Sequence, residues 1–252
     1  LLDTVNSKYK INFSDYFIFR HPLIIYDFES IKKILSDHSI SIFPSELNGK
    51  MEDVLNSKIK FKWTQTGYLI EDTNTQLILP NYKIESNVII FTSVGGGNAI
   101  NIFHNYIVLK PVITNFCLEN HKKLKSPYLC IQIRNTDYKC DYKKLYDENK
   151  ELIHSYETIY IATDDVKSIQ FFKDNGLNVY NFTTFPEGEY KTLHVHDNIN
   201  KEKRLLDLFS DIFIITMADK LISVSTGGFI NFVRSCHENS QIISQKFKHP
   251  TE

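Results

Sequence analysis

Arginine is scarce in this chain, and one arginine stands where ligand chemistry is expected. Four of the 29 basic residues are arginines, and Arg134 directly follows the apolar run 128–133. A guanidinium binds a diphosphate through two parallel N–H···O contacts, which a lysine cannot reproduce. The alternative is an ion pair with Asp137 that only fixes the loop. The position of Arg134 at the end of a predicted strand favours the phosphate-binding interpretation.

Two adjacent carboxylates follow the next apolar run, 158–162. Asp165 stands just before a predicted helix and is expected to cap it through the first free N–H groups. Asp164 could instead accept hydrogen bonds from a ribose or from the N–H edge of a guanine. Adjacent acids also suggest Mg²⁺ or Mn²⁺, but the DxD spacing of metal-dependent transferases is absent here. We therefore expect no metal at this site.

A run of small residues follows the apolar segment 220–224 and precedes another predicted helix. The run is Ser225, Thr226, Gly227 and Gly228. Small side chains let the backbone approach a phosphate closely, and a helix N-terminus adds free N–H groups and a favourable dipole. A simple helix cap with a glycine turn remains an equal alternative. A second glycine run, 95–97, is more typical of a turn.

The elements that position these residues alternate regularly from residue 126 onward. Strands are predicted at 128–133, 158–162, 177–182 and 220–224, and helices at 141–151, 166–175, 201–218 and 229–236. Strands that are apolar throughout and separated by helices indicate a parallel sheet covered on both faces. In such doubly wound, Rossmann-like sheets, ligands bind beyond the carboxyl ends of the strands.

The preceding part of the chain is less regular. It predicts a strand at 22–26, a helix at 29–36 and a buried strand at 87–92. An apolar-periodic segment at 98–109 predicts a helix, and Pro111 begins or kinks a second one that runs to about residue 123. We divide the chain into a smaller α/β domain, 1–110, and a ligand-binding domain, 111–252.

Composition narrows the class of partner. A length of 252 residues with a net charge of −1 is typical of a globular protein and lacks the basic excess of a nucleic-acid binder. No apolar run approaches the ~18 residues of a membrane span. The four cysteines show no CxxC spacing and are predicted to be reduced. A cytoplasmic location follows, or a Golgi or secretory one if an N-terminal anchor precedes Leu1.

The motifs together resemble the donor half of the fucosyltransferases. The resemblance covers roughly residues 105–237 and extends to the alpha-1,6-fucosyltransferases, the rhizobial nodulation enzymes and, more loosely, the protein O-fucosyltransferases. The segments that carry it, in order along the chain, are 109–111, 131–137, 161–165, 211–219 and 225–227.

The resemblance implies a GT-B-like, inverting, metal-independent glycosyltransferase that transfers fucose from GDP-fucose to a glycan acceptor. It implies that Arg134 binds the β-phosphate, that Asp164 and Asp165 face the nucleoside, and that Asp211 supports the donor pocket. It also implies that Ser225, Thr226 and Gly227 hold the phosphates, with Gly228 beside them. Departure of a diphosphate without a metal requires positioned cations and N–H donors, which agrees with these roles.

Two departures from the family pattern bear on the reaction. The family has histidine where this chain has Gln132, and the residue that looks like the acceptor base has no counterpart, which leaves Asp137 and Asp141 as candidates. Two alternatives to a fucosyltransferase therefore stay open. One is a glycosyltransferase with a xylose or rhamnose donor, and the other is a nucleotide-sugar-binding module without activity. An epimerase or dehydrogenase would need a GxGxxG turn after a strand, which the glycine run 95–97 does not provide.

Overall fold

The computed structural model divides the chain into two compact units. The first comprises residues 1–13 and 22–97, and the second comprises residues 14–21 and 98–252. The structure describes residues 11, 13–20, 33, 37, 39–50, 52–53, 58–64, 67–77, 84–89, 99–188, 190, 193 and 200–248.

The first unit contains short strands around a small apolar cluster. Its strands are β2 (Ile42–Phe43), β3 (Phe61–Thr64), β4 (Gly67–Ile70), β5 (Thr75–Leu77) and β6 (Val88–Ile89), and the 3₁₀ helix η2 spans Ser45–Leu47. Strands β3, β4 and β5 form an antiparallel meander, and β2 pairs with β6 in parallel. The buried cluster consists of Ile42, Leu47, Ile59, Ile70 and Leu77.

Several sequence-based expectations fall in this part of the chain. The strand expected at 87–92 contains β6 at Val88–Ile89. The expected strand 22–26 and the glycine run 95–97 lie outside the described residues. The expected helix 29–36 lies outside them as well, apart from Lys33, which is helical.

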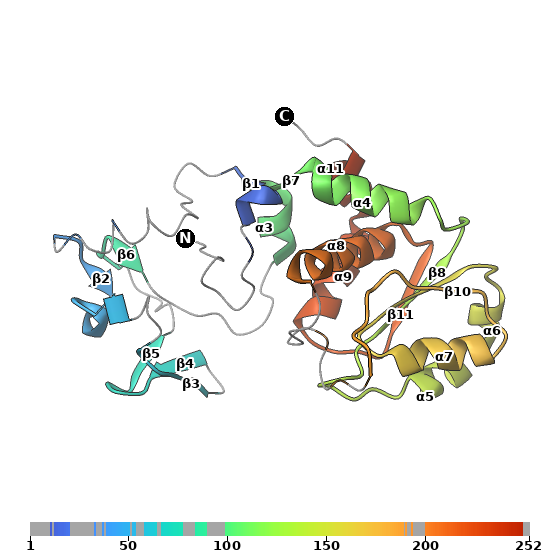
Figure 1. The fold of residues 1–252 in the computed structure, drawn as a ribbon, viewed down its shortest axis with the longest axis horizontal. Coiled ribbons are helices and arrows are strands. Elements are labelled where there is room, and N and C mark those ends of the chain that lie inside the picture. The colour runs from blue at the N-terminus through green and yellow to red at the C-terminus, as the bar shows by residue number, and fades with distance from the viewer. Residues whose placement is uncertain are drawn as a thin grey trace. The chain divides into compact units, whose positions relative to one another are not determined.

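The second unit carries most of the regular structure (Figure 1). The 3₁₀ helix η1 (Phe13–Asp15) straddles its first boundary. Its strands are β1 (Phe17–Phe19), β7 (Ile107–Leu109), β8 (Leu129–Ile133), β9 (Ile159–Thr163), β10 (Val179–Tyr180) and β11 (Lys220–Ser223). Its helices are α3 (Ala99–Tyr106), α4 (Pro111–His121), α5 (Tyr142–Glu148), α6 (Lys150–His154), α7 (Val166–Asp174), α8 (Lys201–Met217), α9 (Gly228–Glu238), α10 (Ser240–Ile243) and α11 (Gln245–Lys248).

Four strands form the predicted parallel sheet, in the order β10-β9-β8-β11. Every neighbouring pair is parallel, with Ile131 of β8 opposite Ile161 of β9 and Ile222 of β11. All five residues of β8 and all five of β9 are buried. A strand that is buried on both faces favours apolar residues, which is why these two segments are nearly continuous apolar runs; the exceptions are Gln132 in β8 and Thr163 in β9.

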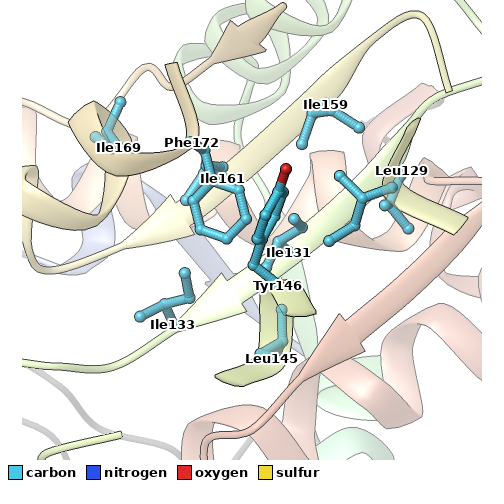
Figure 2. Packing of buried hydrophobic residues seen from close by; sticks show 10 residues of the cluster. Leu129, Ile131, Ile133, Leu145, Tyr146, Ile159, Ile161, Ile169 and Phe172 are labelled. Atoms are coloured by element: carbon cyan, nitrogen blue, oxygen red, sulfur yellow. The ribbon is translucent and has the colours of Figure 1, made fainter. Parts of the chain in front are cut away.

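Alternate residues of the central strands face different helices. Leu129, Ile131 and Ile133 of β8 pack with Ile159 and Ile161 of β9 against α5, α6 and α7, as Figure 2 shows for most of this cluster. The intervening Tyr160 instead hydrogen-bonds to a residue of α8. Helix α8 therefore covers the opposite face, where it packs against α4 and α9 (Figure 1). The sheet is the middle of three layers.

One expected helix is wrong at its end. The segment 98–109 does not continue as a helix, because α3 ends at Tyr106 and residues 107–109 form β7. Strand β7 pairs antiparallel with β1, a partner about 90 residues earlier. Ile107 and Val108 are β-branched and favour a strand once a partner is present. Periodicity within the segment could not show that partner.

Smaller differences concern element ends. The helix expected at 141–151 is two helices that meet at Asn149, and the strand expected at 177–182 is reduced to β10. Residues 98–110, which the sequence placed in the first domain, belong to the second compact unit together with 14–21.

Candidate functional site

The carboxyl ends of β8 and β11 are joined directly. The backbone N–H of Arg134, the first residue after β8, donates to Ser225 Oγ at 2.8 Å. Ser225 follows β11 by two residues and is buried. Because the two strands are parallel neighbours, the phosphate-binding candidates that follow them meet at one edge of the sheet.

A chain of hydrogen bonds supports this junction from below. Ser225 N–H donates to Ser223 Oγ at 3.0 Å, and Ser223 Oγ donates to Gln132 Oε1 at 2.8 Å. Gln132 is 4% exposed, so its amide is part of the core beneath the site. The glutamine therefore has a structural partner on β11 at the position where the resembled family has histidine.

Arg134 and Asp137 form the ion pair that the sequence allowed. Arg134 Nε donates to Asp137 Oδ1 at 2.8 Å, and Arg134 Nη2 donates to Asp137 Oδ2. The hydrogen bond to Asp137 raises the pKa of Arg134, whose side chain stays cationic. The two side chains are 36% and 28% exposed, and solvent-accessible ion pairs of this kind contribute only ~0–1 kcal/mol. The guanidinium is therefore paired but remains accessible to an anion from solvent.

Asp164 organises the loop that carries Arg134. Its Oδ1 accepts from the backbone N–H of Asn135 at 2.7 Å, and its Oδ2 accepts from Thr136 Oγ1 at 2.6 Å. Its carbonyl oxygen accepts from the Tyr190 hydroxyl at 2.9 Å. A carboxylate has about four acceptor positions, so Asp164 retains capacity for a further donor.

Asp165 caps α7, as its position predicts. Its Oδ1 accepts from the backbone N–H of Lys167 at 3.0 Å. Its Oδ2 accepts from Asn135 Nδ2 at 2.6 Å, so the same carboxylate also reaches the loop after β8. The end of β9 is thus tied to the end of β8 by both neighbouring acids.

The turn between β11 and α9 has a backbone that favours glycine. Gly227 has φ 115° and ψ −175°, a region that is essentially restricted to glycine. A Cβ there would meet nothing within 4 Å, so backbone conformation is what requires glycine. The N-cap residue Gly227 has no side chain to cap the first turn of α9, and Thr226 Oγ1 donates to the hydroxyl of Tyr138 at 3.0 Å. The first N–H groups of α9, from Gly228 onward, follow this turn.

Asp211 lies in the interior between α8 and the sheet. Its Oδ1 accepts from the Tyr160 hydroxyl at 2.5 Å, and its Oδ2 accepts from Thr183 Oγ1 at 3.2 Å. Burial and, to a smaller extent, the charge of Asp207 one turn earlier raise the pKa of Asp211 from 3.8 to a net value of about 7. Hydrogen bonds from Tyr160 and Thr183 and the charge of Lys203 oppose the rise. These bonds link Asp211 to β9 and to the segment after β10 rather than to the loop that carries Arg134.

Asp207 is a second buried acid on α8, one turn before Asp211. It is 3% exposed, forms an ion pair with Lys203, and accepts from the backbone N–H of Thr184 at 2.8 Å. Together Asp207 and Asp211 attach residues 183 and 184 to α8. The sequence did not reveal Asp207 as a partner, although its spacing of four residues from Asp211 places both on one helix face.

Asp141 has a capping role in the structure. It precedes α5, is exposed, and its Oδ1 accepts from the backbone N–H of Lys144 at 2.9 Å. This helix cap is a sufficient structural reason for an acid at position 141, without a catalytic role. The candidates that the structure joins through hydrogen bonds are Arg134, Asp137, Asp164, Asp165 and Ser225, whereas Asp141 and Asp211 bond to other partners.

The polar residues that hold these candidates in place carry only a weak signal in the sequence. Asn135 and Thr136 stand beside Arg134 in the sequence, and their types, one amide and one hydroxyl, were the available signal. Tyr138 and Tyr190 reach the site from the loop after β8 and from beyond β10. No local pattern marks these tyrosines, because the hydroxyl of Tyr190 bonds to a residue 26 positions away and that of Tyr138 to a residue 88 positions away.

Among the residues that the structure describes, no group of three or more histidine, cysteine or acidic side chains is placed to hold a metal ion. None of the described helices is long and apolar enough to cross a membrane.

Comparison with solved structures identifies the class of fold. No protein-family model and no curated protein matches the chain. NodZ alpha-1,6-fucosyltransferase is similar in two crystal structures, one soaked with GDP-fucose and one co-crystallised with GDP, with TM-scores of 0.54 and 0.56. In both cases the identity is 14%, and the match covers 88% of this chain and 75% of NodZ.

A weaker likeness links the chain to POFUT1 in complex with GDP. The TM-score is 0.42 at 12% identity, over 62% of this chain and 52% of POFUT1. At identities this low the NodZ likeness establishes the fold, which is the fucosyltransferase-like, GT-B-like α/β fold expected from the motifs.

Proposed function

We propose that this protein is a glycosyltransferase that transfers fucose from GDP-fucose to a glycan acceptor with inversion and without a metal. The observation that carries the proposal is the meeting of Arg134 with the β11–α9 turn at the carboxyl edge of a parallel sheet. This is the edge where such sheets bind ligands. The solved structures of NodZ with the same fold were obtained with GDP-fucose or GDP, which supports the choice of donor.

The diphosphate would bind between Arg134 and the start of α9. Arg134 would exchange the carboxylate of Asp137 for the β-phosphate and keep both parallel N–H donors. The N–H groups of Gly228 and its successors add the dipole of an 11-residue helix. Ser225 would act through its bond to Arg134, and Thr226 would turn its hydroxyl from Tyr138 to a phosphate oxygen.

The same exchange would provide the base. In the transfer step an acceptor hydroxyl oxygen forms a bond to the anomeric carbon of fucose while the bond from that carbon to the β-phosphate oxygen breaks. The electron pair of the broken bond leaves with GDP, and the hydroxyl proton passes to a carboxylate. Asp137, which lies beside Arg134, is the carboxylate we assign to this role. Asp141 is the weaker candidate, because it caps α5.

The nucleoside would lie toward the end of β9. Asp164 retains acceptor capacity for a ribose hydroxyl or a guanine N–H, whereas both oxygens of Asp165 serve α7 and the neighbouring loop. We assign Asp211 an indirect role, in which it supports the donor pocket by holding the segment at Thr183.

A panel of nucleotides tests the donor class. Ligands that bind the folded state raise its melting temperature by mass action. We expect GDP and GDP-fucose to raise the Tm, with UDP and CDP compounds giving no shift at the same concentration. A shift with a UDP-sugar such as UDP-xylose in place of GDP would contradict the fucose assignment.

Turnover separates an enzyme from a binding module. Release of GDP from GDP-fucose should depend on the presence of a glycan acceptor and should vanish when Asp137 is changed to asparagine. Tight binding of GDP-fucose without acceptor-dependent release, across a panel of glycans, would contradict catalysis and leave a nucleotide-sugar-binding protein.

A further inference from the structure

We propose that Asn135 is a positioning residue that locks the loop carrying Arg134 onto the β9–α7 turn. The inference rests on the proposed function in so far as Arg134 binds the diphosphate. Asn135 itself would touch neither donor nor acceptor. It would act by fixing the backbone position from which the Arg134 side chain extends.

Asn135 uses its backbone and side chain for four hydrogen bonds. Its N–H donates to Asp164 Oδ1 at 2.7 Å, and its Nδ2 donates to Asp165 Oδ2 at 2.6 Å. Its Oδ1 accepts from the N–H of Cys140 at 3.3 Å, and its carbonyl oxygen accepts from Lys139 Nζ at 2.7 Å. One residue thus closes the loop 135–140 on itself and fastens it to the end of β9.

An amide suits this position because it must donate at one end and accept at the other. The nitrogen end faces the carboxylate of Asp165, and the oxygen end faces a backbone N–H. An aspartate here would oppose Asp165 with a like charge, while an alanine would leave both partners without their bond. Asp165 is held in turn by its capping bond to Lys167 at the start of α7. The loop is therefore anchored to a helix that packs on the sheet.

The consequence for Arg134 is that its backbone is fixed on both sides. Its own N–H is bonded to Ser225 at the end of β11, and the next N–H along the chain is bonded to Asp164 at the end of β9. Preorganised donors stabilise developing charge because they need no rearrangement at the moment of reaction. Displacement by as little as 1 Å can cost ~10²-fold in rate.

A swap of the two side chains tests the inference in the full-length protein. Asn135→Asp places two carboxylates against each other and should weaken GDP binding by about tenfold. Adding Asp165→Asn restores a donor–acceptor pair with reversed polarity, and asparagine remains a good helix cap. The double variant should therefore recover most of the GDP affinity that the single variant loses. Asn178→Ala is the matched control, because its amide holds the carbonyl of Glu157 at the opposite end of the sheet.

Two measurements are made on each variant: the Kd for GDP by calorimetry and hydrogen exchange of the amides at 134–140. We expect Asn135→Asp to speed exchange in this loop, the double variant to slow it again, and Asn178→Ala to change neither measurement. Recovery of neither measurement in the double variant would overturn the inference, and so would an unchanged GDP Kd in folded Asn135→Asp.

Failure of the proposed function has a different signature. If the wild-type protein binds no GDP, the proposed function is wrong. The hydrogen-exchange data still test whether Asn135 holds the loop at 134–140. Restored protection at 134–140 in the double variant would then support the role of Asn135 in the loop. Loss of protection in both variants would contradict it.

Discussion

The guanidinium of Arg134 is partly exposed to solvent and is paired with Asp137 through two N–H···O bonds. Its pair with Asp137 is partly exposed to solvent, while the backbone on either side is fixed to Ser225 and Asp164. A rigid backbone with an exchangeable anion is what a diphosphate site needs. In our proposal Asp137 is both a stand-in for the phosphate at the guanidinium and the candidate base.

Substitutions of Arg134 should separate charge from geometry. Arg134→Ala should lower kcat by roughly 10²-fold or more, the scale of removing a preorganised donor. Arg134→Lys keeps the charge without the fork and should lose less. The free energy of unfolding should change by no more than ~1 kcal/mol, because the ion pair is exposed. Near-normal kcat with a raised donor KM in Arg134→Ala would show uniform binding instead.

Asp211 should make stability depend on pH. Its folded pKa of about 7 lies above the ordinary value of 3.8, so between about pH 4 and 7 the folded state binds a proton that the unfolded state lacks. The stabilisation is present at low pH and is lost as pH rises toward 7, by up to about 1.4 kcal/mol per pH unit. Asp211→Asn mimics the protonated acid and removes this dependence.

Urea denaturation of both proteins from pH 4.5 to 7.5 measures this effect. The wild-type free energy of unfolding should fall relative to that of Asp211→Asn as pH rises. A constant difference across the range would show that the carboxyl of Asp211 does not titrate there, in spite of its burial between α8 and β9.

The turn before α9 contains two adjacent glycines that should differ in their effect on stability. Gly227 and Gly228 are neighbours, but only the former of this pair has a positive φ. Gly227→Ala should reduce the free energy of unfolding by ~1–3 kcal/mol through backbone strain. Gly228→Ala, within the first turn of α9, should change it far less. Equal losses for both variants, measured by urea denaturation, would contradict this explanation.

The buried strands were predictable because burial on both faces imposes a local pattern. Strands β8 and β9 match their apolar runs to within one residue, and α7 and α8 match their helical periodicity closely. The edge strand β10 is much shorter than its apolar run, because pairing is limited to Val179 and Tyr180. Strand β7 was missed because its partner β1 lies near the start of the chain.

The site was predictable in part for the same reason. The end of a buried strand is visible in the sequence as the point where an apolar run gives way to polar residues. Arg134, Asp164 and the Ser225 turn could therefore be predicted. Their mutual bonds were not, because the Arg134–Ser225 contact spans 91 residues and depends on the order of the strands. Asn135 shows the limit most clearly, since nothing in its local sequence marks the side chain as the link to Asp165.

For the whole molecule, the second unit includes a distant segment of chain. Strand β1 comes from residues 14–21, and Tyr16 and Phe17 are buried. Phe17 contacts Phe209 of α8 with ring centroids 5.3 Å apart. The unit that carries the candidate site therefore should not be complete as residues 98–252 alone.

A shortened protein tests this dependence. Residues 14–21 can be joined to 98–252 by about six glycine and serine residues, since α3 spans only ~12 Å between β7 and its own start. The joined protein should exceed a 98–252 fragment in free energy of unfolding by about 3 kcal/mol, from two buried aromatic side chains. Equal stability of the two proteins would show that β1 is dispensable to the unit.

We expect Arg134 and the β11–α9 turn to bind the diphosphate of a guanine nucleotide without a metal. Calorimetric titration of the full-length protein with GDP in excess EDTA measures this directly, with Arg134→Ala titrated alongside. We predict saturable binding by the wild-type protein and a loss of at least about tenfold in affinity for the variant. Binding that disappears on chelation, or that is equal in the two proteins, would contradict the account.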